Sequence, residues 1–369
     1  MTAPDFATRR NKLIRSLKSA GVDALLVSSE SNVRYLTGFT GDSSWLFVSR
    51  GNTLLISDSR YSTQIADECP ELRAEIRDVG KSMSELTAMV VKASRTGRLG
   101  LEGDYVTVAQ HVALEEKIDS AKLVVTSSLT EQLRAVKDKW EIAETKHAIY
   151  QAERGIAVTR ASLRPDQSEL EIRFTLEASM RNFGAVGPAF ESIVGVGPNA
   201  ALPHAHAGSR QVGESSLLLI DWGAQTKSGY RSDLSRVFFT GRITKKMENV
   251  YETVLVAQQT AIQQIKPGVA CKDVDAVARG VIAEAGYGRR FGHALGHGVG
   301  LDIHEAVRLG PQSKETFKAG MIVTVEPGIY LEGRFGIRIE DDVLVTRDGS
   351  EVLTSVPREF DDAIIEFLA

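Results

Sequence analysis

The chain has 369 residues, which is long for one average domain and sufficient for two. Apolar residues make up 43% of it, charged residues 25%, and the formal net charge is −4, so nothing indicates nucleic acid or an anionic membrane as a partner. No apolar run reaches membrane-spanning length, no signal peptide is recognisable, and the two cysteines form no disulfide or metal-binding pattern, which fits a cytoplasmic protein best.

The first part of the chain alternates helix and strand patterns. Apolar residues at helical spacing over residues 13–20 predict a helix that ends at Gly21. Strand-like apolar runs occur at residues 24–27, 45–48, 53–56 and 123–125. The sequence Arg50-Gly51-Asn52 lies between the second and third runs and predicts a hairpin turn. We therefore expect a compact α/β domain over residues 1–127.

A second domain is expected over residues 128–369. It begins with a long helical pattern over about residues 130–163. Ser168 and Glu171 form a capping-box pattern for a helix that ends near Gly184. Further helices are predicted over residues 250–265 and 274–282, and strands over residues 217–220, 237–239, 322–325, 337–339 and 343–345. This mixture predicts an α+β domain in which an antiparallel sheet carries helices on one face.

Histidine is concentrated in the second domain. Five of the seven histidines fall between His204 and His304, and His293, His297 and His304 share one short run with four glycines. Glycine allows the backbone to approach a neighbouring group closely and to adopt a positive φ. A single histidine in such a place is usually structural, but this cluster favours a functional site.

Two aspartates flank a predicted hairpin. Asp221 ends an apolar strand, where it either starts a turn or needs a partner, because burying a bare charge is costly. If residues 224–229 form the loop, Asp221 and Asp233 lie opposite each other with Cβ atoms roughly 5 Å apart. Carboxylates that close repel unless a proton or a cation lies between them. The alternative for Asp233 is an ion pair with Arg231 or Arg236.

Two glutamates occur in similar positions. Glu326 ends a second apolar strand, and Glu340 shares a strand face with Arg338, although that face could also be exposed to solvent. Two aspartates, two glutamates and one histidine suit Mn, Co, Zn or Fe(II). Four carboxylates are more than one catalytic zinc takes, and shared carboxylates can hold two ions about 3.5–4 Å apart. The sequence therefore favours a two-metal site.

These residues resemble a known family. The ordered set Asp221, Asp233, His297, Glu326 and Glu340 is similar to the ligand set of the pita-bread metallopeptidases of family M24. The phrases LPHA, SDLSR, GHGVGLDIHE, TVEPGIY and GIRIEDD resemble its Xaa-Pro aminopeptidase and prolidase branch. The resemblance spans roughly residues 130–355, and SNVRYLTGFTGDSSW and SDSRY resemble the branch's N-terminal domain. It implies a C-terminal pita-bread domain with a curved antiparallel sheet and an N-terminal creatinase/prolidase-type α/β domain.

The resemblance also implies roles for the proposed ligands. It implies two divalent ions per subunit, with Mn or Co as the first expectation and Zn or Fe as alternatives. Asp221 would bind one ion, His297 and Glu326 would bind the other, and Asp233 and Glu340 would bridge them. Glu326 would also act as the general base for the attacking water.

Five further side chains receive expectations from the same resemblance. His204 and His304 would orient the scissile carbonyl and stabilise the developing negative charge on its oxygen. His293, Arg338 and Tyr330 would contact the substrate or support the ligands. His206 has no role in the family pattern, and we expect it to be structural.

The sequence departs from the family pattern at two places. The two aspartates are twelve positions apart, where the family pattern has eleven. The extra residue belongs either to the hairpin loop near residues 225–228 or to a bulge at Asp221, and the bulge would put its ligand role in doubt. Ser235 stands where the family often has threonine, and either hydroxyl can hold a carboxylate.

The resemblance implies hydrolysis of the bond between an N-terminal residue and a following proline, by a homodimeric enzyme. A dipeptidase needs a group for the free carboxylate beside proline, and the sequence does not identify which arginine supplies it. One rival is a methionine aminopeptidase, which shares the ligand set but lacks the large N-terminal domain. A creatinase-like hydrolase would not need the metals, and a binding protein that has lost catalysis usually loses ligands.

Overall fold

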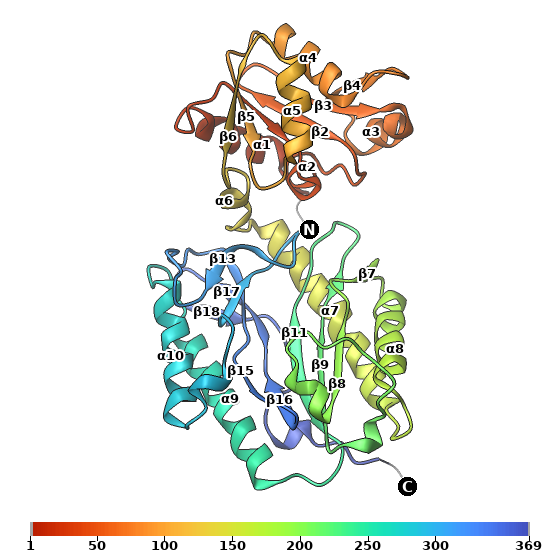
Figure 1. Ribbon diagram of the computed structural model, residues 1–369, viewed down its shortest axis with the longest axis vertical. Helices are drawn as coiled ribbons and strands as arrows, with labels where there is room; N and C mark the ends of the chain where they lie inside the picture. Colours follow the sequence, from red (N-terminus) through yellow and green to blue (C-terminus); the bar gives the residue numbers. More distant parts are fainter. Residues whose placement is uncertain (1–2, 368–369) are drawn as a thin grey trace. The chain divides into compact units, whose positions relative to one another are not determined.

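A computed structural model describes residues 3–367, and the described chain divides into two compact units, Ala3–Arg134 and residues 135–367 (Figure 1). The first unit is drawn in red to yellow and the second in yellow to blue. No helix of the described residues combines the length and apolarity that a membrane span requires.

The first unit contains one mixed sheet with the strand order β4-β3-β2-β1-β5-β6. Its elements are α1 (Phe6–Leu17), β1 (Ala24–Val27), α2 (Glu30–Thr37), β2 (Trp45–Ser49), β3 (Thr53–Asp58), α3 (Ser62–Glu68), β4 (Arg73–Arg77), α4 (Met83–Ala93), β5 (Arg98–Glu102), α5 (Val108–Lys117), β6 (Lys122–Thr126) and α6 (Glu131–Arg134). The four predicted strands and the β2–β3 hairpin are confirmed. One face packs on α4 and α5, where Leu26, Phe47 and Ile56 meet Val90 and Leu114.

The second unit is built from antiparallel strand pairs and two pairs of helices. Its elements are α7 (Lys139–Ala161), α8 (Glu169–Asn182), β7 (Gly187–Pro188), β8 (Ile193–Val196), β9 (Leu217–Trp222), β10 (Ala224–Gln225), β11 (Leu234–Phe239), α9 (Lys245–Gln264), α10 (Cys271–Glu284), β12 (Gly296–Gly298), β13 (Glu305–Leu309), β14 (Ile322–Val325), β15 (Gly328–Leu331), β16 (Phe335–Arg338), β17 (Asp341–Val345) and β18 (Ser350–Val352). The predicted capping box is present, since the Ser168 hydroxyl accepts from the Glu171 N–H and the Glu171 carboxylate accepts from the Ser168 N–H.

The prediction of one long helix over residues 130–163 is wrong. The segment forms α6 and α7, with a break over residues 135–138. Asp138 causes the new start, because its carboxylate accepts from the N–H groups of Trp140 and Glu141 at 2.9 Å and completes a capping box with Glu141.

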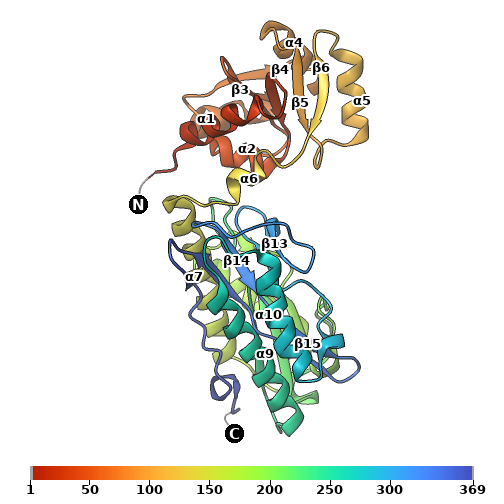
Figure 2. The same cartoon turned by 90° about the vertical axis from the view of Figure 1, so that its left-hand side faces the viewer.

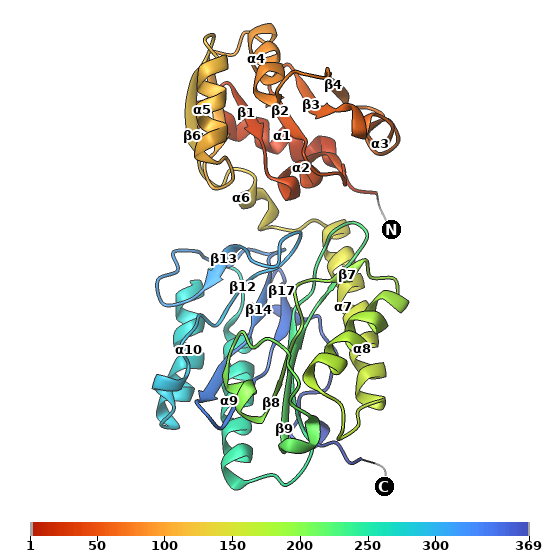
Figure 3. The same ribbon diagram turned by 45° about the vertical axis from the view of Figure 1, so that its right-hand side comes forward.

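Three antiparallel strand groups surround the proposed metal ligands. One sheet has the order β11-β9-β8, a second has the order β13-β12-β14-β17-β18, and β15 and β16 form a hairpin. A bridge between Ser235 and Glu340 joins the first sheet to the β16–β17 segment. Helices α9 and α10 pack side by side (Figure 2), and α7 and α8 lie along the β8–β9 strands (Figure 3).

Each helix pair buries its own side of the strands. On the α7–α8 side, Ile156 and Leu176 pack with Leu218 and Ile220, which lie on one face of β9. Trp222 on the same face donates its indole N–H to the Ala152 carbonyl at 3.0 Å, which ties β9 to α7. The α9–α10 side buries apolar residues of β9, β11, β14, β16 and β17 in a second core. These two cores fix the strands from which the proposed metal ligands project.

Candidate metal centre

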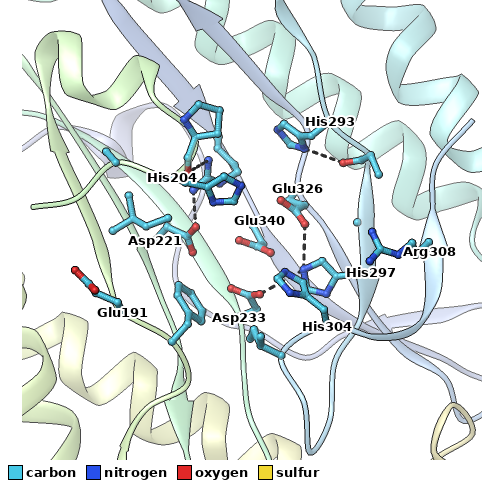
Figure 4. Close-up of a pocket in the computed structure, with 18 of the residues that line it drawn as sticks. Glu191, His204, Asp221, Asp233, His293, His297, His304, Arg308, Glu326 and Glu340 are labelled. Carbon is cyan, nitrogen blue, oxygen red and sulfur yellow. Dashed lines mark hydrogen bonds and ion pairs between the residues drawn. The ribbon is translucent and has the colours of Figure 1, made fainter. Parts of the chain in front are cut away.

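The five proposed ligands come from five separate segments and face one cavity of about 540 Å³ (Figure 4). Asp221 lies in β9, Asp233 directly precedes β11, His297 lies in β12, Glu326 directly follows β14, and Glu340 lies between β16 and β17. The cavity is also lined by His204, His293, His304 and Arg338. The structure therefore brings together side chains that are up to 119 positions apart between Asp221 and Glu340.

The centre of the cluster is tight. One ligand atom each of Asp233, His297 and Glu340 lies within 4.8 Å of the other two. His297 Nε2 is 3.3 Å from Glu326 Oε1 and 3.6 Å from Asp233 Oδ2. The spacing of these oxygen and nitrogen atoms suits a common cation, and the donor set matches the preference of Mn, Co, Zn or Fe(II).

The register of the hairpin corrects one expectation. Asp221 pairs with Ser235, not with Asp233, and Leu234 pairs with Trp222. The two aspartates are therefore diagonal neighbours, which still face the same side of the sheet because they differ from direct opposition by two positions. The β9–β11 pairing runs without a register shift through all six residue pairs, so no bulge occurs at Asp221. The pairing continues to a bridge between Gln225 and Arg231, and the loop closes beyond it.

Asp221 has an unusual set of neighbours. Arg338 Nη2 contacts Asp221 Oδ2, while the same guanidinium donates to the Ser235 and Tyr330 hydroxyls at 2.8 Å. Asp221 Oδ1 is buried and has no hydrogen-bond partner among the described residues. A buried carboxylate oxygen without a partner is energetically costly, so a cation at this oxygen would satisfy it. The residues present therefore fit a metal ion.

Electrostatics support the same conclusion. Burial, and then the charges of neighbouring carboxylates, raise the pKa values of Asp233 and Glu340 well above their ordinary range. Burial raises the pKa of Glu326 to about 8. Burial, followed by the neighbouring His304, lowers the pKa of His297 to about 3, which keeps its imidazole neutral and able to bind a metal. The carboxylates repel one another, and a divalent cation removes that repulsion.

Gly296 explains part of the glycine-rich run. A Cβ atom at this position would lie 2.0 Å from the Thr324 carbonyl oxygen, so only glycine lets β12 approach β14 here. The adjacent His297 N–H donates to the Thr324 hydroxyl at 3.0 Å. The close approach brings His297 beside Glu326.

The other expected residues take distinct places. The rings of His304 and His297 meet edge to face with centroids 4.4 Å apart. His293 Nε2 is 2.9 Å from the Tyr330 hydroxyl, and burial lowers the pKa of His293 to about 4. His206 also lines the cavity, but its side chain is 88% exposed and lies near Glu191.

A buried ion pair holds the backbone at Glu340. Arg236 Nη2 lies 2.6 Å from Asp341 Oδ1, and its Nη1 donates to the Glu340 carbonyl at 2.6 Å. The ion pair between Arg236 and Asp233, which the sequence left open, is therefore replaced by one with Asp341. Arg231, the other candidate, donates to the Ala189 carbonyl.

Sequence reasoning missed Arg308. Its side chain lines the cavity, and in the strand pairing it lies opposite His297 (Figure 4). The available signal was its place four positions after His304, on a segment for which the sequence predicts no strand.

Comparison with known proteins gives the family. The model of metallopeptidase family M24 matches residues 143–347, and the model of the creatinase/prolidase N-terminal domain matches residues 9–136. The chain belongs to metallopeptidase family M24. This membership confirms the two-domain pita-bread fold and makes the chain a metal-dependent peptidase by family.

Three relatives of this M24 peptidase span nearly its whole length. It is 35% identical to the uncharacterized peptidase YqhT of Bacillus subtilis, over 94% of this chain and 98% of the relative. It is 35% identical to the solved structure of an Xaa-Pro dipeptidase from Bacillus anthracis, with a TM-score of 0.93 over 98% of this chain and 100% of the other. It is 36% identical to that of an X-Pro aminopeptidase from Thermotoga maritima, with a TM-score of 0.85 over 94% and 99% of the two chains.

Proposed function

We propose that this M24 peptidase hydrolyses the bond between an N-terminal residue and a following proline, with two divalent ions held by Asp221, Asp233, His297, Glu326 and Glu340. The observation that carries the proposal is the buried cluster in which ligand atoms of Asp233, His297 and Glu340 lie within 4.8 Å of one another. Bound divalent ions supply positive charge that activates water and stabilises negative charge on the carbonyl oxygen. Mn or Co is proposed first, and Zn or Fe are the alternatives.

Each ligand then has a task. Asp233 and Glu340 would hold both ions, Asp221 would hold one of them, and His297 with Glu326 would hold the other. Glu326 accepts a proton from the attacking water and delivers it to the leaving amine. Its position supports this role, since Glu326 lines the cavity and its Oε1 lies 3.3 Å from His297 Nε2.

His204 and His304 are assigned to the scissile carbonyl. Both line the cavity, and burial lowers the pKa of His304, so its imidazole is neutral near pH 7 and retains one N–H donor. A donor held in place before the reaction stabilises the developing oxyanion more than it stabilises the neutral carbonyl. His293, Tyr330 and Arg338 form one chain of contacts beside Asp221, and we assign them to support of the ligands.

Preference for proline must depend on shape. The amide before proline has no N–H to donate, so a site cannot select it by a hydrogen bond to that group. Phe190, Ile193 and Ile303 supply apolar walls to the cavity, which suits contact with a pyrrolidine ring or with the residue before it.

Arg308 bears on the choice between a dipeptidase and an aminopeptidase. Of the two arginines that line the cavity, Arg338 is held by Asp221, Ser235 and Tyr330, whereas the guanidinium of Arg308 forms no hydrogen bond or ion pair with other side chains or backbone of residues 3–367. We propose that Arg308 binds the free carboxylate of an Xaa-Pro dipeptide.

Arg308→Met should raise KM for Ala-Pro by about 10- to 100-fold, because a charged hydrogen bond contributes about 1.5–3 kcal/mol. Its effect on Ala-Pro-Ala should stay below about threefold, since that carboxylate lies one residue further away. Arg334→Met, at an exposed position of the β15–β16 turn, is the matched control. An equal rise in KM for both substrates would show that Arg308 does not bind the carboxylate of the dipeptide.

The proposed reaction is tested with metal-loaded and chelator-treated protein on Ala-Pro, Ala-Pro-Ala and Ala-Ala. Cleavage of at least one proline substrate, weak or no cleavage of Ala-Ala, and loss of activity on chelation are expected. A folded, metal-loaded protein that leaves both proline substrates uncut would overturn the proposal. Methionine aminopeptidase activity is the nearest alternative, and the match of residues 9–136 to a creatinase/prolidase N-terminal domain argues against it.

A homodimer is also part of the proposal, on the basis of the family resemblance. Light scattering of the purified protein tests it directly, and a monomer at micromolar concentration would contradict it.

A further inference from the structure

Lys137 and Glu305 form an ion pair that the proposed reaction leaves unexplained. Lys137 Nζ lies 3.0 Å from Glu305 Oε2, and the two side chains are 1% and 4% exposed. Taking both charges out of water is costly, so a buried pair is often no more stabilising than apolar residues of similar volume. The role of this ion pair therefore depends on the groups that it holds in position.

Glu305 holds the connection between β12 and β13. This connection, residues 299–304, ends in His304. Glu305 Oε1 accepts from the Leu301 N–H at 3.0 Å and from the Asp302 N–H at 3.4 Å. The Glu305 carboxylate thus accepts from backbone N–H groups of the connection through Oε1 and pairs with Lys137 through Oε2. The imidazole that we assign to the scissile carbonyl sits directly before this carboxylate in the chain.

Gly300 shows how closely the connection wraps around that carboxylate. A Cβ atom on Gly300 would lie 2.6 Å from Glu305 Oε1, so a side chain here would displace the carboxylate. The Gly300 carbonyl in turn accepts from the Arg231 N–H at 2.9 Å. The connection is therefore folded around Glu305, and its geometry depends on where Glu305 is held.

Lys137 itself is fixed by its backbone. Its N–H donates to the Gly320 carbonyl at 2.9 Å, and the next residue, Asp138, caps α7. A lysine side chain normally loses much rotamer freedom on burial, but a backbone anchored on both sides keeps the ammonium near one place.

We infer that Lys137 is a positioning residue of the hydrolytic site, which through Glu305 fixes the β12–β13 connection and with it the His304 imidazole. The inference rests on the proposed function, in which His304 contacts the substrate carbonyl. Lys137 is not among the residues that line the cavity, and its ammonium pairs with Glu305. A displacement of about 1 Å in a catalytic group can lower the rate about 100-fold, so a distant anchor has a measurable effect.

The test compares Lys137→Met and Glu305→Gln with Lys146→Met. Lys146 is the matched control, because it lies on α7 and pairs with Glu351 at 2.7 Å while both side chains are about half exposed. Either test variant should lower kcat for the preferred Xaa-Pro substrate by roughly 10- to 100-fold. KM and bound metal should stay near wild-type values, and the double variant should lose little more than either single one. The control should retain wild-type kcat.

Hydrogen exchange of the metal-loaded protein gives a readout that does not depend on the substrate. The peptide that covers residues 299–305 should exchange faster in both test variants, because the Leu301 and Asp302 N–H groups lose their held acceptor. A folded Lys137→Met protein with wild-type kcat and wild-type exchange would overturn the inference, and so would a loss of kcat that follows loss of metal. If Lys137→Met does not fold, Glu305→Gln decides by the same criteria.

The two proposals can fail separately. Should the wild-type protein cleave no Xaa-Pro substrate, the proposed function fails, while the exchange comparison still shows whether the pair holds the connection. If the wild-type protein cleaves Ala-Pro and neither variant changes kcat or exchange, the positioning role fails alone.

Discussion

Glu340→Gln should lower kcat on an Xaa-Pro substrate by about 1,000-fold and reduce the metal bound per chain. Glu340 is fully buried at the centre of the cluster, where its Oε2 accepts from the Ser235 hydroxyl at 2.8 Å. An amide keeps the volume of the side chain but removes the charge that both ions are proposed to share, and a bound metal contributes several kcal/mol to transition-state stabilisation. Activity and metal content are measured on the same preparation.

Glu332→Gln is the matched control for this variant. Glu332 is exposed, and it follows β15 by one residue, so the same chemical change should alter neither activity nor metal content there. Wild-type metal content and activity in the Glu340→Gln protein would show that this carboxylate is not a ligand.

The second large effect concerns the metal-free protein. Burial raises the pKa of Glu326 from 4.5 to about 8, and those of Asp233 and Glu340 well above their ordinary range. Between about pH 6.5 and 8 the unfolded chain has released protons that the folded, metal-free chain still holds at these groups, while His293 and His297, whose pKa values burial lowers, are largely neutral in both states. The unfolded state therefore binds fewer protons, and the free energy of unfolding falls as pH rises through this window.

Thermal unfolding in a chelator should show this fall directly. We expect the metal-free Tm to drop by several degrees or more between pH 6.5 and pH 8, since 1 kcal/mol corresponds to about 2–4 °C for a domain of this size. Bound metal should remove the drop, because the cation neutralises the carboxylates and stabilises only the folded state. Glu326→Gln should flatten the metal-free profile. A Tm that rises from pH 6.5 to pH 8 in the chelated wild type would contradict the burial of these groups.

Much of the fold and of the cluster was accessible from the sequence because the signals are local. Apolar strands that end in a carboxylate placed Asp221 and Glu326, and the glycine-rich run located His297 and His304. The break between α6 and α7 was also locally encoded, since Asp138 and Glu141 form a capping box inside an otherwise continuous apolar pattern. The helical periodicity over residues 130–163 outweighs this capping signal and predicts a single helix.

Other features depend on contacts that no local pattern contains. The spacing of Asp221 and Asp233 does not determine their register, and the pairing of Asp221 with Ser235 follows from where the loop closes. The partners of Arg236 and Lys137 lie 105 and 168 positions away, so only the folded chain identifies them. Arg308 carries no motif of its own, and its place in the cavity becomes visible only after β13 pairs with β12.

The most direct test of the account is anomalous diffraction from crystals of the Mn-loaded protein at the manganese edge. The proposed two-metal site predicts two peaks per chain within coordination distance of Asp221, Asp233, His297, Glu326 and Glu340, with Asp233 and Glu340 near both. Absence of any peak among these five side chains, in protein loaded with excess metal, would contradict it.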